Sequence, residues 1–74
     1  MEHKLKDSFV SALGIPAEQV TDELKYADHP NWDSVAHMAL IAAIEEAFDI
    51  MIDAEDVIDM SSFAKARQIV AKYI

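Results

Sequence analysis

Apolar side chains recur at α-helical spacing in three segments of this 74-residue chain, and this periodicity limits the fold more than any other feature. The first segment covers about residues 4–13. It ends before Gly14, a common C-cap residue, and Pro16, which cannot continue a helix. Its inward face consists of Leu5, Phe9, Ala12 and Leu13. The segment predicts an amphipathic helix, followed by a single helical turn at residues 16–20.

A second helix is predicted to begin at Asp33 or Ser34 and to end near Phe48. Both residues are good N-caps, and a carboxylate at that end also interacts favourably with the helix dipole. Val35 and Ala42 fall toward the outer edge of this helix and are expected to be exposed. The inward stripe is expected to contain Met38, Ile41, Ile44 or Glu45, and Phe48, with Leu40 and Ala47 beside it.

The C-terminal part of the chain predicts one short and one longer helix. The sequence Asp53-Ala54-Glu55-Asp56 resembles a capping box and predicts a short third helix over residues 54–59. Ser61 or Ser62 then caps a fourth helix, from Phe63 to about Tyr73. The apolar stripe of that helix is formed by Phe63, Ala66, Ile69, Val70 and Tyr73.

The remaining segments predict no sheet. The apolar run at residues 50–52 has no partner strand anywhere in the chain, so an extended connector is expected. Residues 21–31 form a long loop, for which Val20, Leu24 and Tyr26 are the expected anchors. The chain contains no cysteine, so the fold must rest on packing alone. We expect a single all-α domain over residues 1–74, a small bundle of three main helices and a short third one.

Acidic residues dominate the charge of the chain, which is −8 at neutral pH. Between Lys25 and Lys65 there is no Lys or Arg, and nine acids occur: Asp28, Asp33, Glu45, Glu46, Asp49, Asp53, Glu55, Asp56 and Asp59. Such a surface repels nucleic acid and anionic membranes and attracts basic protein surfaces. A solvated face that only maintains solubility is the alternative interpretation. These acids lack the glycine and spacing of a calcium-binding loop, so no metal site is predicted.

No segment has the pattern of a signal peptide or a membrane anchor. The longest apolar run covers residues 38–44, far too short to span a bilayer. A cytoplasmic protein is therefore the expectation.

Ser34 stands where a polar loop gives way to the most apolar stretch of the chain. A serine at a helix N-terminus lies beside unpaired backbone N–H groups that favour an anion, so this is a good attachment point for a phosphate. An ordinary N-cap is the alternative role. A hydrolase nucleophile is not indicated, because no glycine-rich elbow surrounds this serine.

From Asp33 to the C-terminus the chain resembles acyl carrier proteins without gaps. The resemblance rests on Asp33-Ser34-Val35, where the family has an Asp-Ser-Leu attachment motif, and on the acidic third helix. It also covers Ile44-Glu45-Glu46-Ala47-Phe48-Asp49-Ile50 at the close of the second helix. The first helix and the long loop agree in length and pattern, so the resemblance spans essentially the whole chain.

The resemblance implies a non-catalytic carrier, a monomer that shuttles acyl groups between enzymes. A phosphopantetheinyl transferase would attach 4'-phosphopantetheine to Ser34, using Mg²⁺ that belongs to the transferase. The arm would hold acyl groups as thioesters for acyl-transferring, condensing or ligase enzymes. Basic grooves of these partners are expected to dock on acids and on an apolar patch. The acids are Asp33, Glu45, Glu46, Asp53, Glu55 and Asp56, and the patch is Val35, Ala42 and Ile52, although Ile52 can also be a core residue.

The neighbourhood of Ser34 departs from the housekeeping type of carrier. Carriers of fatty acid synthesis usually have acids two and five positions after the serine, where this chain has Ala36 and Ala39, and a small residue where it has Trp32. Trp32 either packs under the loop or helps to receive the arm. His37 either contacts the phosphate or packs inside. This combination resembles carriers of specialised pathways, such as polyketide, aminoacyl or small-acid tailoring systems. An aminoacyl or peptidyl carrier and an unmodified acidic interaction module are the alternative functions.

Overall fold

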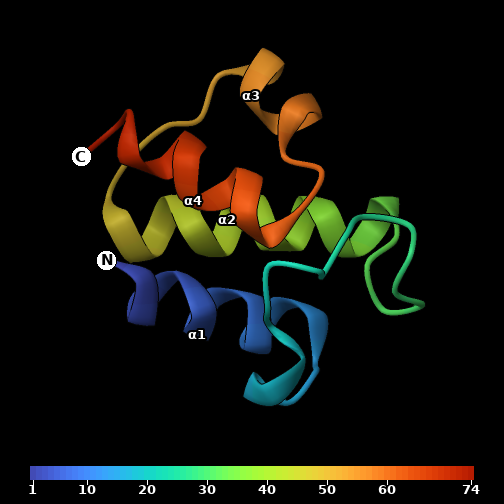
Figure 1. Cartoon of the computed structure of the whole chain (residues 1–74). Helices are drawn as coiled ribbons and strands as arrows, with labels where there is room; N and C mark the ends of the chain where they lie inside the picture. The colour runs from blue at the N-terminus through green and yellow to red at the C-terminus, as the bar shows by residue number, and fades with distance from the viewer.

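Helices make up the regular structure of residues 1–74, all of which the computed structural model describes. They are α1 (Glu2–Leu13), the 3₁₀ turn η1 (Ala17–Gln19), α2 (Ser34–Phe48), α3 (Ala54–Asp59) and α4 (Phe63–Ala71). Figure 1 shows α1 alongside α2, with α3 and α4 on the other side of the molecule and both chain termini at the same end. The predicted all-α fold is confirmed, and residues 50–52 form a connector. No helix is long and apolar enough to cross a membrane.

An aromatic cluster joins distant parts of the chain in the core. The Phe9 ring of α1 packs edge-on against Trp32, with ring centroids 5.2 Å apart, and against Phe63 of α4, at 5.1 Å. Edge-to-face geometry places the positive edge of one ring over the negative face of another, which adds to the gain from apolar burial. All three side chains are almost completely buried. They belong to a core of 16 buried residues, contributed by α1, the long loop, α2, α4 and their connectors.

The buried face of α2 differs from the predicted stripe. Leu40, Ile41 and Ile44 are buried as expected, whereas Met38 is 62% exposed and the prediction that it faces inward is wrong. At about 100° per residue, the residues in line with Ile41 and Ile44 are positions 37 and 48. His37 therefore takes the inward position that was assigned to Met38.

The long loop between η1 and α2 is anchored at several points. Val20 and Leu24 are buried, as predicted. Tyr26 is 38% exposed, but its ring packs edge-on against Trp32, with centroids 6.1 Å apart, and its N–H donates to the Ser61 carbonyl at 2.9 Å. The Phe63 N–H donates to the Leu24 carbonyl at 3.0 Å. These bonds attach the loop to the connection between α3 and α4, which explains how so long a loop holds one path.

Side chains of the C-terminus hold α3, which has no buried residue of its own. The predicted capping box is wrong, because the Asp53 side chain makes no cap hydrogen bond and the Asp56 carboxylate faces the C-terminus. Asp56 accepts hydrogen bonds from Lys72 Nζ at 2.8 Å and from the Tyr73 hydroxyl. The Tyr73 oxygen in turn accepts the Asp53 N–H at 3.0 Å. A six-residue helix without buried side chains depends on such polar contacts to keep its place.

The stability of the fold is expected to depend on the charge of the Asp56 carboxylate at low pH. Hydrogen bonds from Lys72 and then Tyr73 hold the pKa of Asp56 below its ordinary value of 3.8. Since the folded-state pKa is the lower one, this stabilisation is complete above pH 3.8 and is lost as the pH falls through the folded-state pKa. We expect Asp56→Asn to lower the urea midpoint at neutral pH, and the gap to wild type to close below pH 3.8. Glu55→Gln, an exposed change in the same helix, should show no such convergence with wild type. If the urea midpoints of Asp56→Asn and wild type differed equally at all pH values, this role of Asp56 would be contradicted.

Candidate functional site

Ser34 is the first residue of α2, and its hydroxyl is not used to cap the helix. The N-cap is Asp33, whose extended backbone (φ −103°, ψ −174°) lets its Oδ1 accept the Ala36 N–H at 2.9 Å. The alternative of Ser34 as an ordinary N-cap is therefore excluded. Ser34 is exposed, and the N–H groups of Ser34 and Val35 belong to the first turn, where no helical carbonyl is available. The site combines a free hydroxyl with the positive end of a fifteen-residue helix.

An apolar groove opens beside Ser34, between the start of α2 and α3. Its volume is about 320 Å³, and its lining consists of Tyr26, Ser34, His37, Met38, Val57, Ile58 and Met60. Met38 and Ile58 are strongly exposed and lie at the rim, whereas Met60 is buried. A group attached to the Ser34 oxygen thus has apolar surface within reach.

A chain of hydrogen bonds runs from the core to α3 behind this groove. The Trp32 indole Nε1–H donates to His37 Nδ1 at 3.0 Å, and His37 Nε2 lies 2.8 Å from the Val57 carbonyl oxygen. Because Nδ1 accepts a hydrogen bond, the network assigns the ring proton to Nε2, which donates to Val57. Both ring nitrogens of His37 are therefore occupied by protein partners.

These contacts bear on the two roles predicted for each residue. Trp32 has no exposed surface and packs under the loop, so its indole cannot meet an arm on Ser34. His37 is half-buried and lines the groove, but contact with a phosphate would require it to give up one of its two hydrogen bonds. The Trp32–His37–Val57 connection was not predicted. Its one signal in the sequence is that His37 falls in line with the buried stripe of α2.

Some of the predicted docking residues are exposed, and others form hydrogen bonds within the protein. The exposed residues are Asp33, Val35, Ala42, Glu46, Asp53 and Glu55. The Glu45 carboxylate accepts the Ile52 N–H at 2.9 Å, and Asp56 is held by Lys72 and Tyr73. Ile52 is 9% exposed and belongs to the core, so its assignment to a surface apolar patch is corrected. The hydrogen bond from the Ile52 N–H to the Glu45 carboxylate ties this part of the connector to α2.

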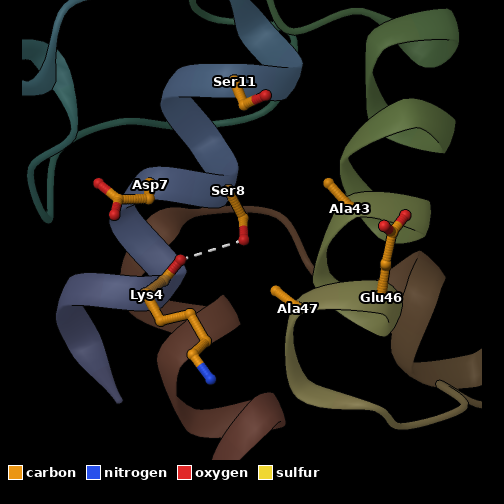
Figure 2. A pocket seen from close by; sticks show the side chains of 7 residues that line it. All are labelled: Lys4, Asp7, Ser8, Ser11, Ala43, Glu46 and Ala47. Atoms are coloured by element: carbon orange, nitrogen blue, oxygen red, sulfur yellow. Dashed lines mark hydrogen bonds between the residues drawn. The ribbon is translucent and has the colours of Figure 1, made fainter.

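A second groove lies between α1 and α2, far from Ser34. Figure 2 shows the residues that line it, Ala43, Glu46 and Ala47 of α2 and Lys4, Asp7, Ser8 and Ser11 of α1, with the Asp7 carboxylate turned away from α2. The Ser8 hydroxyl donates to the Lys4 carbonyl at 3.1 Å, which satisfies the one buried polar residue of the core region. Glu46 comes twelve residues after Ser34, roughly 18 Å along the helix axis at about 1.5 Å per residue. This groove is therefore separate from the Ser34 site.

Comparison with known proteins gives two findings. The family model described as a phosphopantetheine attachment site matches residues 3–70. An acyl carrier protein of Chlorobium phaeobacteroides is 31% identical over 72 residues, which cover 97% of this chain and 92% of that protein. Members of this family are non-catalytic carriers whose cofactor is 4'-phosphopantetheine, attached by a phosphopantetheinyl transferase. With its helix order and length, the chain belongs to the phosphopantetheine-binding carrier family, as a carrier of the acyl carrier protein type.

Proposed function

We propose that Ser34 is the attachment point of 4'-phosphopantetheine and that the protein presents acyl thioesters to partner enzymes of a specialised biosynthetic pathway. The observation that carries this proposal is the Ser34 hydroxyl, which is exposed, does not cap the helix and belongs to the first residue of α2. In the attachment step the Ser34 Oγ–P bond forms as the phosphoanhydride bond of coenzyme A breaks. Adenosine 3',5'-bisphosphate leaves, and the hydroxyl proton passes to the transferase.

The residues around Ser34 fit such a group. Asp33 caps α2 and so fixes where the Ser34 oxygen stands, while the first-turn N–H groups favour a phosphodiester charge. The groove provides apolar surface at Met38 and Ile58 for a chain that leaves Ser34. When bound, the cofactor supplies the terminal thiol that forms thioesters, which the chain itself lacks because it has no cysteine.

The exposed surface around α2 supports docking of basic partners by charge at one end and by apolar contact at the other. Glu46, Asp53 and Glu55 are exposed toward the end of α2 and the start of α3. Near Ser34, Val35 is 80% exposed and Ala39 is also exposed, and the acid next to them is the N-cap Asp33. Partners should therefore meet apolar surface close to the arm, which favours a specialised pathway over general fatty acid synthesis.

The test is to incubate the apo protein with coenzyme A and a broad-specificity phosphopantetheinyl transferase and to measure its mass. We expect one prosthetic-group increment in the wild type and none in Ser34→Ala. Ser11→Ala, an exposed serine of α1, is the matched control and should be modified like wild type. A wild-type mass that stays unchanged would contradict the carrier function and favour an unmodified interaction module.

A further inference from the structure

We propose that His37 is the fixed inner end of the Ser34 groove and limits the cargo to short acyl groups. This inference rests on the proposed attachment of the arm to Ser34. It assigns to His37 the role of a specificity-determining residue, which neither docking nor attachment requires.

The His37 ring separates the groove from Trp32. It lines the groove, whereas Trp32 does not and has no exposed surface. The two rings lie edge to edge, joined by the hydrogen bond from Trp32 Nε1 to His37 Nδ1, with centroids 6.0 Å apart and planes at 26°, so the indole lies beyond the Nδ1 edge of the imidazole. Tyr26 closes the adjacent side, since its ring centroid lies 5.3 Å from that of His37. An acyl group that entered the groove after its arm folded back would meet the imidazole before it could reach the indole.

Two hydrogen bonds hold the imidazole in this position. If the ring swung aside, the buried indole N–H of Trp32 would lose its acceptor, and an unpaired buried donor is costly. The bond to the Val57 carbonyl would break as well, and with it one of the few polar contacts that hold α3. Met60, the other inner residue of the groove, has an unbranched side chain that adapts to its neighbours. His37 is therefore the rigid part of the inner wall.

The consequence is a length limit. A short acyl group can lie against Met38 and Ile58 at the rim and end before His37. In this proposal the tail of a long acyl group is stopped by the pinned ring and stays on the surface, where its apolar area remains in water. The groove thus favours short apolar cargo.

The test uses the holo protein loaded with acetyl, butyryl, octanoyl or dodecanoyl groups. Trp32 is the only tryptophan, so one indole N–H signal in the ¹H–¹⁵N spectrum reports on the space behind His37. In wild type we expect this signal to keep its holo position with all four groups. In His37→Ala it should keep its own holo position with acetyl and shift with octanoyl and dodecanoyl.

Two variants serve as controls. His37→Gln retains an acceptor for the indole and a donor for Val57, so it should restore the wild-type response. Met51→Ala changes an apolar residue that is 81% exposed and lies outside the groove, and it should also respond like wild type.

Each outcome decides the question. An indole signal that shifts with long acyl groups in wild type overturns the inference, and this measurement needs no variant to fold. The inference is also overturned if His37→Ala folds but its indole signal shifts with none of the four groups. It is overturned as well if the indole signal shifts with long acyl groups in Met60→Ala and not in His37→Ala. If wild type gains no arm mass, the proposed function fails instead, so the two failures are distinguishable.

Discussion

Replacement of Trp32 by alanine is expected to lower the free energy of unfolding by about 3–5 kcal/mol, the range for large aromatic side chains removed from a core. Trp32 has no exposed surface and packs edge-on against both Phe9 and Tyr26. Its loss leaves a cavity beside Phe9 and removes the hydrogen bond to His37. Small domains are stable by only about 5–15 kcal/mol, so this single change should leave the protein near its unfolding threshold.

Urea denaturation, followed by circular dichroism, measures this effect. Trp32→Phe is the matched control, because it keeps an aromatic ring against Phe9 and loses only part of the volume and the indole N–H. We expect its loss of stability to be clearly smaller than that of Trp32→Ala. A Trp32→Ala protein within about 1 kcal/mol of wild type would show that Trp32 is not a central core residue.

Leu24→Ala is the second change with a large expected effect, a loss of about 2–5 kcal/mol. Leu24 is 6% exposed and is the buried anchor in the middle of the long loop. Its carbonyl also accepts the N–H of Phe63, the first residue of α4. Loss of the side chain should therefore weaken both the core and the attachment of the loop to α4.

Chemical denaturation gives the size of the Leu24 effect, and amide hydrogen exchange gives its location. The Phe63 and Tyr26 amides, which bond across the loop, should exchange faster in Leu24→Ala. Met51→Ala is the control, since Met51 is an apolar residue that is 81% exposed, and its change should stay within about 0.5 kcal/mol. Unchanged exchange at both amides would mean that the loop is anchored independently of Leu24.

Helix boundaries were predicted well because their signals are local. The caps at Asp33 and Ser62 each accept an N–H three residues ahead, so the sequence alone contains both partners. Gly14 ends α1 in the left-handed conformation for the same kind of reason. The buried face of α2 was harder to predict, because helical periodicity defines the spacing of apolar residues but does not say which side of the helix faces the core. Met38 and His37 differ by one position, and only packing decides which one turns inward.

The sequence by itself determined the helix order, the acidic surface and the placement of Ser34 at the start of α2, since each depends on residues within a few positions of one another. The tertiary structure alone decided the contacts between residues far apart in the chain. His37 meets the Val57 carbonyl across 20 positions, and Asp56 meets Tyr73 across 17. Such partners are brought together by the packing of α3 against α2 and α4, and no local pattern encodes them. The position of Ser34 at the start of α2 is therefore a property of the sequence, whereas the shape of the groove beside it is a property of the fold.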